Sequence, residues 1–219
     1  MDSMQGDIVF IFFGLAIREV VMTTWGIMAL LVLISVAVTR HLLPMPGKAQ
    51  TLIEAAVLAI DEAIRTVNPG GAEKILPLIA TLWLFLATAN LLGVIPGLHS
   101  PTRDLSVTTA LALVVFASVH YFGVTTLGRG YFAHYLRPSP ILLPFHLISE
   151  ATRTLALAVR LFGNMMSLEI AALLILMVAG FLAPVPILML HIIEALVQAY
   201  IFGMLALIYV SGAMQREGE

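Results

Sequence analysis

The feature that most limits what this chain can fold into is a set of five long runs without a charged residue. The runs lie at 20–39, 75–102, 105–128, 170–193 and 195–215. About 20 consecutive apolar residues are enough for a helix to cross the hydrocarbon core of a bilayer. The composition agrees, because 60% of the 219 residues are hydrophobic and 11% are charged, whereas soluble domains carry about 25% charged residues. The sequence therefore predicts an all-α integral membrane protein.

Charges, glycines and prolines delimit five predicted membrane helices within and around these runs. Their expected bounds are 20–39, 76–94, 105–127, 141–181 and 187–210. The fourth is longer than a perpendicular crossing requires, so it should tilt strongly, lie partly along the interface, or be broken. No internal repeat, low-complexity tract or soluble segment divides the chain, so we expect a single membrane domain over residues 1–219.

A sixth helix is predicted at 48–67, between the first two spans. Its apolar and charged residues fall on different helical faces, with Ile53, Val57, Ile60 and Ile64 on one face and Glu54, Asp61 and Arg65 on another. The segment is too interrupted by charge to span a bilayer. It is predicted to lie on the membrane surface or against a partner, and a plain surface connector is the alternative.

The distribution of basic residues predicts the orientation, because cytoplasmic loops carry an excess of Lys and Arg. If the N-terminus lies outside, the outer loops hold only Arg103, and the cytoplasmic segments hold Arg40, Lys48, Arg65, Lys74, Arg129, Arg137 and Arg216. The sequence therefore predicts an outer N-terminus and a cytoplasmic C-terminus. The acidic start, MDSMQGDIVF, lacks the features of a cleaved secretory signal, so we expect it to remain in the mature chain.

Ionisable and amide side chains concentrate in the last two predicted helices. The fourth carries Glu150, Arg153, Arg160, Asn164 and Glu169, and the fifth carries His191, Glu194, Gln198 and Tyr209. An arginine at the centre of a spanning helix costs about 2.5 to 3.5 kcal/mol on insertion scales, so such residues usually have a function. On a helix, Arg160 shares one face with Arg153, Asn164 and Ser167. Glu169 lies about 180° around from Arg160, and the polar residues of the fifth helix form one stripe.

Structural roles stay open for several of these residues. Arg153 could extend its head to the cytoplasmic interface, and Glu150 is close enough to a helix end to be interfacial. Asn164 and Gln198 could simply join helices by hydrogen bonds. Two isolated histidines are interpreted as packing or pore-edge groups, namely His120 and His146.

The four remaining ionisable residues are interpreted as functional, namely Arg160, Glu169, His191 and Glu194. Burial and pairing can bring the proton affinities of Glu and His near neutrality, so an inlet lined by them could conduct protons from the outer side. Arginine does not release its proton and cannot relay one, but it can repel cations, block leakage or hold a carboxylate ionised. No equally central acidic residue lies on the face of Arg160, so we expect its carboxylate partner to belong to another subunit.

Other functional classes lack the residues that they require. Cysteine is absent, which excludes a disulfide framework, a thiolate metal site and a cysteine nucleophile. An intramembrane hydrolase is disfavoured because neither H-E-x-x-H nor G-x-S-x-G occurs. A transporter built on paired repeats is disfavoured because five spans do not divide into equal halves. No phosphate-binding loop occurs, so the chain itself is not expected to hydrolyse ATP.

Four stretches carry a family resemblance: LALAVRLFGNMMSLE, HIIEALVQAYIFGMLALIYVS, PLIATLWLFLATANLLGVIPG and PTRDLSVTTALAL. They resemble segments of subunit a of the rotary, F-type ATP synthases, the membrane stator that faces a rotating c-ring. In the first stretch the residues at matching positions are Arg160, Asn164 and Glu169. In the second they are His191, Gln198 and Tyr209. The resemblance covers about residues 8–213; RLFGN alone would be weak, but its combination with the downstream helix is specific.

The resemblance implies a mechanism built on two offset half-channels. The last two helices would form a long tilted hairpin against the c-ring. An ion would enter past Glu169, His191 and Glu194 and neutralise a c-subunit carboxylate. After nearly a full turn of the ring, this carboxylate would release the ion to the cytoplasm. It would then pass Arg160. The candidates for the cytoplasmic half-channel are Glu150 and Arg153.

The resemblance also implies partners and a location. The expected partners are the c-ring, the subunit b peripheral stalk, the catalytic ATPase sector reached through the stalks, and the lipid bilayer of a bacterial inner membrane. No cofactor, metal ion or nucleic acid is expected, and the chain by itself would not be an enzyme.

The chain departs from the family pattern at two places. Many members have Ser-Arg-Pro-Leu-Ser before the arginine helix where this chain has TRTLA. Thr152 and Thr154 thus replace a serine and a proline, so no proline is present to bend the chain there. Glu194 stands where many members have an apolar residue, which makes the inlet unusually acidic. The coupling ion, H⁺ or Na⁺, stays open, as do the ring size and the direction in which the complex mainly runs.

Overall fold

The computed structural model describes residues 8–12, 15–40, 47–95, 98–128, 130–131, 141, 143–180 and 185–215. In these ranges the long helices are α1 (Glu19–Arg40), α2 (Lys48–Val67), α3 (Ala72–Leu92), α4 (Leu105–Leu127), α6 (Leu143–Ala179) and α7 (Val185–Met214). A short 3₁₀ turn, η2 (Pro101–Arg103), precedes α4. An antiparallel hairpin of β1 (Ile8–Phe12) and β2 (Leu15–Arg18), which the sequence did not predict, precedes α1.

Five of these helices are long and apolar enough to cross a membrane, namely α1, α3, α4, α6 and α7. The predicted all-α membrane fold is therefore confirmed. Three helices extend beyond their predicted bounds, α1 by one residue at each end. The α3 helix begins at Ala72 rather than 76, where Asn68 Oδ1 accepts a hydrogen bond from the Gly71 amide at 3.0 Å. The α7 helix continues to Met214, which is buried against the end of α2.

The core lies mainly between α3 and α7. Trp83 of α3 stacks on Tyr200 of α7, with ring centroids 5.9 Å apart, and its indole N–H donates to the Tyr200 carbonyl oxygen at 3.2 Å. This approach needs Gly203, because a Cβ there would lie 1.8 Å from the Trp83 nitrogen. Small residues at helix contacts allow such close packing in membranes.

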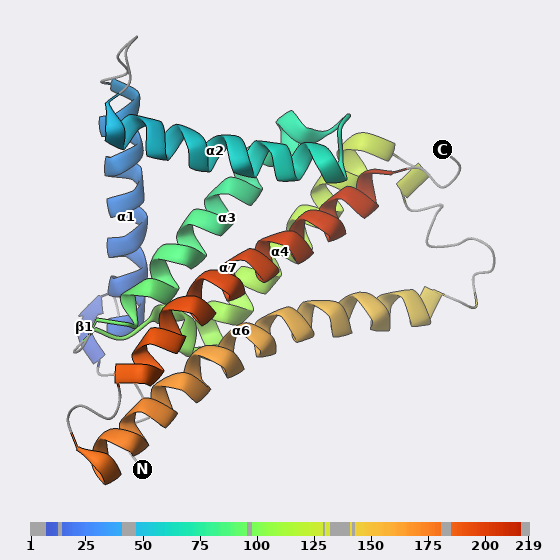
Figure 1. Ribbon diagram of the computed structural model, residues 1–219. Coiled ribbons are helices and arrows are strands. Elements are labelled where there is room, and N and C mark those ends of the chain that lie inside the picture. Colours follow the sequence, from blue (N-terminus) through green and yellow to red (C-terminus); the bar gives the residue numbers. More distant parts are fainter. Residues whose placement is uncertain are drawn as a thin grey trace.

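The predicted amphipathic helix is α2, which crosses one end of the bundle, where α1 ends and α3 begins (Figure 1). Ile64 is fully buried in the core and Ile60 is partly buried against it, whereas Val57 and Leu58 are exposed. Asp61 and Arg65 form an ion pair at 2.7 Å on the charged face. The helix is therefore docked near its C-terminal end and presents Val57 and Leu58 outward near its middle.

The last two helices form a long hairpin, and α6 runs obliquely to α1 (Figure 1). Its 37 residues are continuous, so of the three predicted alternatives the broken helix is wrong. At a rise of 1.5 Å per residue such a helix is about 55 Å long. The hydrocarbon core is about 30 Å thick, so α6 can cross it only when strongly inclined or when part of it lies outside the core.

Candidate functional site

Arg160 lies near the middle of α6 with an exposed side chain. Its neighbours Leu157, Ala158 and Leu161 are buried in the core, and this apolar pattern turns the intervening arginine outward. Within the part of the chain that the structure describes, no carboxylate oxygen lies within 4.0 Å of its guanidinium. The arginine therefore faces away from the bundle without a charged partner of its own there.

One turn further along α6, Asn164 joins α6 to α7. Its amide nitrogen donates to Gln198 Oε1 at 2.8 Å. Gln198 is 1% exposed, and its own amide nitrogen has no hydrogen-bond partner among the described side chains and backbone. Such a buried donor is normally satisfied by water or another ligand. The pair thus forms the hydrogen bond between helices that was one of the two alternatives from the sequence. It also leaves one donor, the Gln198 amide, without a partner among the described residues.

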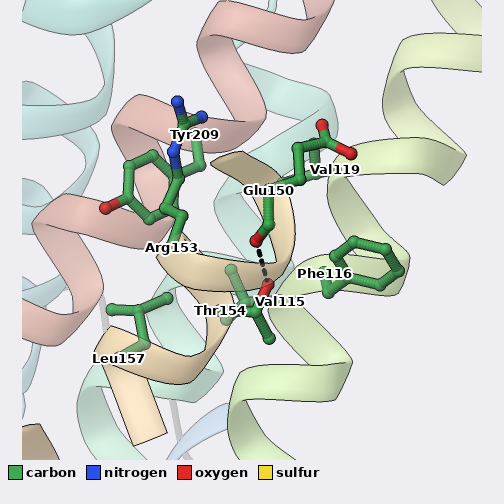
Figure 2. A pocket seen from close by; sticks show the side chains of 8 residues that line it. All are labelled: Val115, Phe116, Val119, Glu150, Arg153, Thr154, Leu157 and Tyr209. Carbon is green, nitrogen blue, oxygen red and sulfur yellow. Dashed lines mark hydrogen bonds between the residues drawn. The ribbon is translucent and has the colours of Figure 1, made fainter. Parts of the chain in front are cut away.

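A pocket between α4, α6 and α7 contains both predicted cytoplasmic-side candidates. Figure 2 shows Glu150, Arg153 and Tyr209 in its wall, together with Val115, Phe116, Val119, Thr154 and Leu157. The Arg153 guanidinium lies 4.6 Å from the centre of the Tyr209 ring, a cation–π contact. Arg153 is therefore held by an aromatic ring of α7 on the protein side.

Glu150 contacts His120 of α4, which was interpreted from the sequence as a packing or pore-edge group. His120 Nε2 lies 3.3 Å from Glu150 Oε2, and His120 Nδ1 lies 2.9 Å from the Phe116 carbonyl oxygen. A carbonyl oxygen can only accept, so Nδ1 carries a proton in that bond. A second proton, on Nε2, would make the ring a cation and the contact with the Glu150 carboxylate an ion pair. An ionisable pair therefore lies beside the pocket.

Near the other end of α6, Glu169 is bound by the connection between α3 and α4. Arg103 Nη1 donates to Glu169 Oε1 at 2.5 Å, and His99 Nδ1 lies 2.9 Å from the same oxygen. Glu169 keeps 22% of its side-chain surface exposed. Sequence reasoning missed this role for both partners; the one available signal was that Arg103 stood alone as a basic residue in the outer loops.

His191 and Glu194 lie on α7, and their surroundings differ. His191 is 3% exposed, and its Nε2 has no hydrogen-bond partner within the described protein. Glu194 is half-buried one turn further along. Both Glu169 and Glu194 act electrostatically on His191. His191 is therefore within electrostatic range of both carboxylates, although Glu169 makes its hydrogen bonds to the loop rather than to His191.

Along α7, Tyr209 of the predicted polar stripe and the apolar residues in line with it, Phe202 and Leu205, lie on the packed side of the helix. Phe202 is buried, and Leu205 and Tyr209 are half-buried against the core. Of the other positions considered, His146 is half-buried on α6, while Arg129, Arg137 and Arg216 lie outside the described residues. Within the described ranges no three His, Asp or Glu side chains are grouped so as to hold a metal ion.

Comparisons with known proteins give the family. The sequence model of the family described as "ATP synthase A chain" matches residues 21–211. ATP synthase subunit a 1 of Hahella chejuensis is 68% identical over 94% of this chain and 88% of its own length. ATP synthase subunit a 2 of Pelobacter propionicus is 60% identical over 92% and 89%, and ATP synthase subunit a of Legionella pneumophila strain Corby is 56% identical over 92% and 89%. The chain therefore belongs to the ATP synthase A chain family, which makes it a non-catalytic, ion-translocating membrane subunit of an ATP synthase.

Proposed function

We propose that this chain supplies two offset half-channels that carry H⁺ or Na⁺ to and from a carboxylate on a rotating c-ring, with Arg160 as the fixed charge between them. The single observation that carries the proposal is the exposed Arg160 side chain, which has no carboxylate partner in the described part of the chain. A permanent cation in a low-dielectric setting needs an opposite charge. A carboxylate presented from outside the chain supplies it.

The spacing of polar groups along α6 supports two separate half-channels. Glu150 lies ten residues before Arg160 and Glu169 lies nine residues after it. On a helix these steps are about 15 Å and 13 Å along the axis. The arginine thus stands almost halfway between two groups that are too far apart to exchange an ion directly. An ion could therefore pass from one of these groups to the other only when it is carried by a ring carboxylate that moves past Arg160.

In the outer half-channel, Glu169, His191 and Glu194 would deliver the ion. The unpartnered Nε2 of buried His191 favours a hydrated path at this depth, because a buried polar atom needs water or a ligand. The ion neutralises the ring carboxylate, and the neutral site can rotate through lipid at far lower cost than an ionised one. Asn164, Gln198 and Tyr209 would order water and side chains along the path.

In the cytoplasmic half-channel, the ion would leave through the pocket of Figure 2. The Glu150–His120 contact supplies a group that can accept a proton, and Arg153 lies in the same wall. Arg160 favours the ionised ring carboxylate and so promotes release on this side. Each ion crossing the membrane contributes about 2.3 kcal/mol per 100 mV, so several crossings are needed per ATP.

The proposed surroundings follow from the same arrangement. The exposed apolar side of the α6–α7 hairpin would face the c-ring, and α2 would lie at the cytoplasmic surface of a bacterial inner membrane, against lipid or the subunit b stalk. The catalytic ATPase sector would connect through the stalks. The N-terminus would lie outside and the C-terminus in the cytoplasm. On that orientation Arg18 joins Arg103 on the outer side, and the excess of basic residues remains cytoplasmic.

The test is substitution of Arg160 in reconstituted vesicles containing the whole ATP synthase. Arg160→Ala should abolish ATP synthesis and permit passive ion leak, because the barrier between the half-channels is removed. Arg160→Lys should abolish synthesis without loss of assembly, since a lysine lacks the multi-donor head and can lose its proton when desolvated.

Two measurements are needed together, namely potential-driven ion flux and ATP synthesis, with a check that ring and stalk remain bound. Substantial ATP synthesis by an assembled Arg160→Ala complex would refute the proposed role.

A further inference from the structure

We propose that Arg103 is a positioning residue for ion entry: it holds the Glu169 carboxylate at the outer end of α6, and His99 adjusts that hold. The inference rests on the proposed outer half-channel, because it concerns what controls Glu169 there. It adds two residues from the connection between α3 and α4 to a path otherwise built from α6 and α7.

The contact is a three-way group rather than a simple ion pair. Arg103 Nη1 lies 2.5 Å from Glu169 Oε1 and 2.9 Å from His99 Nδ1, and that nitrogen lies 2.9 Å from the same Glu169 oxygen. A guanidinium can only donate, and an ionised carboxylate can only accept. The proton on the imidazole therefore decides which bond His99 makes.

Two arrangements are compatible with these distances. If His99 Nδ1 carries no proton, it accepts from Arg103, and Glu169 is held by Arg103 alone. If Nδ1 carries a proton, it donates to Glu169 and no longer accepts from Arg103. A doubly protonated His99 would also repel the guanidinium. The strength with which Arg103 holds Glu169 thus depends on the protonation of His99, whose side chain is 45% exposed and open to outer water.

The loop that carries these residues is anchored to α3 and α7 by hydrogen bonds. Between His99 and Arg103, the Ser100 hydroxyl donates to the Ala89 carbonyl oxygen at 2.8 Å, and the Thr102 hydroxyl donates to Asn90 Oδ1 at 2.7 Å. Asn90 Nδ2 in turn donates to the Ala195 carbonyl oxygen of α7 at 3.2 Å. Asn90, Ser100 and Thr102 are all buried.

A buried, mutually satisfied polar chain of this kind fixes a loop, because breaking it would leave unpaired groups in an apolar setting. Side chains along this loop alternate between the buried anchor and Glu169. Residues 100 and 102 point into the anchor, while residues 99 and 103 reach Glu169. The Arg103–Glu169 contact is therefore held in place by α3 and α7, unlike an ordinary exposed salt bridge between two mobile side chains.

The charged groups on the surrounding elements do not replace Arg103. Glu19 begins α1, which packs near η2. Asp104 caps α4 by accepting from the Ser106 amide at 2.8 Å. On α7, Glu194 and His191 interact electrostatically, and Glu169 also acts on His191. Among the described groups, Arg103 is the one permanent cation in contact with Glu169.

The test compares single and double variants in vesicles containing the complete ATP synthase. Arg103→Leu should lower potential-driven ion flux on the order of tenfold, the effect of losing a charged hydrogen bond. Arg103→Lys should restore most of it. The double variant Arg103→Leu with Glu169→Gln should be no slower than Glu169→Gln alone, because Arg103 acts through that carboxylate. His99→Gln should make the flux less dependent on outer pH, because a glutamine side chain does not change its charge.

Arg18→Leu is the matched control, since it removes an exposed arginine on the same proposed side and should leave flux unchanged. If Arg103→Leu keeps the flux and pH profile of the unmodified complex, or if its effect multiplies with that of Glu169→Gln, the positioning role is overturned. If instead Glu169→Gln itself has no effect, the proposed outer half-channel fails. Copurification of ring and stalk identifies variants that fail to assemble. If Arg103→Leu fails to assemble, the flux of the Arg103→Lys complex is compared with that of the unmodified complex to test the positioning role.

Discussion

At the level of single side chains, the charged residues of α6 differ in what balances their charge. Glu169 contacts Arg103, and Glu150 contacts His120, so each carboxylate has a cationic or titratable partner on another element. Arg160 has no such partner in the described part of the chain, and its side chain is exposed. An unbalanced charge is the costly one in a membrane. Arg153 also lacks a carboxylate partner among the described residues, but its guanidinium lies over the Tyr209 ring. Arg160 is therefore the residue that most needs a charge from a second subunit.

Glu194 gives the first prediction at this scale. It is half-buried one turn from His191, on which it acts electrostatically together with Glu169. We therefore expect the three side chains to act together in ion entry. Glu194→Leu should slow ion-driven turnover several-fold, on the order expected for loss of one partly buried charge interaction, without making the membrane leaky, because Arg160 remains. The measurement is ATP synthesis and passive flux over a wide pH range.

Glu73→Leu is a suitable control, because Glu73 is an exposed carboxylate in the first turn of α3. Its removal should change neither rate. Unchanged transport by Glu194→Leu at every pH would mean that this carboxylate is idle, and that the acidity of the inlet has no part in ion entry.

At the level of helices, close approach of α3 and α7 depends on small residues along α7. Ala195, Ala199 and Ala206 are buried, and Gly203 receives the Trp83 ring. Because lipid is as apolar as most side chains, helix association in membranes depends on such packing and on interhelical hydrogen bonds. Both occur here, since Asn90 and Trp83 each donate to an α7 carbonyl oxygen.

Gly203→Ala should therefore destabilise the bundle. The added Cβ would lie 1.8 Å from the Trp83 nitrogen and 2.1 Å from Cδ1, so the indole must leave its stacked position on Tyr200. Overpacking of this kind costs about 1 to 3 kcal/mol. Thermal unfolding of the purified complex should begin at lower temperature, and Trp83→Leu in the same chain should recover part of the loss.

Gly212→Ala is the matched control in the same helix, because a Cβ there meets nothing within 4 Å. It should be neutral or slightly stabilising, since alanine favours helix more than glycine does. Equal melting of the two variants would show that the α3–α7 contact yields more easily than its geometry suggests.

The helices themselves could be predicted from the sequence because their signals are local. The uncharged run at 105–128 predicts a helix that the structure has at Leu105–Leu127, and the period of 48–67 predicts α2. The contacts of Glu169 could not be predicted in this way. His99 and Arg103 lie about 70 residues before it, and only the fold of the α3–α4 connection brings them together. His120 was similarly underestimated, because nothing in its local sequence indicates Glu150.

At the scale of the whole molecule, one end of the bundle differs from the other. The α2 helix covers the end where α1 finishes and α3 begins, and the C-terminal part of α7 reaches the same end (Figure 1). The connection with His99 and Arg103 lies beyond the far end of α3, next to the part of α6 that carries Glu169. The described chain thus has two polar regions at opposite ends, with Arg160 between them. The proposed pair of half-channels requires such an arrangement.

This polarity predicts the side from which each end can be labelled. The native chain has no cysteine, so single cysteines can be introduced without background. Glu54→Cys and Glu62→Cys lie at exposed positions on α2, and Leu98→Cys lies at an exposed position in the connection before η2.

Because basic residues flank α2, we expect both α2 cysteines to react with a membrane-impermeant maleimide only in inverted vesicles. Leu98→Cys should react only in right-side-out vesicles or intact cells. Labelling of the α2 cysteines from outside, with Leu98→Cys labelled from within, would reverse the proposed orientation and exchange the entry and exit assigned to the two half-channels.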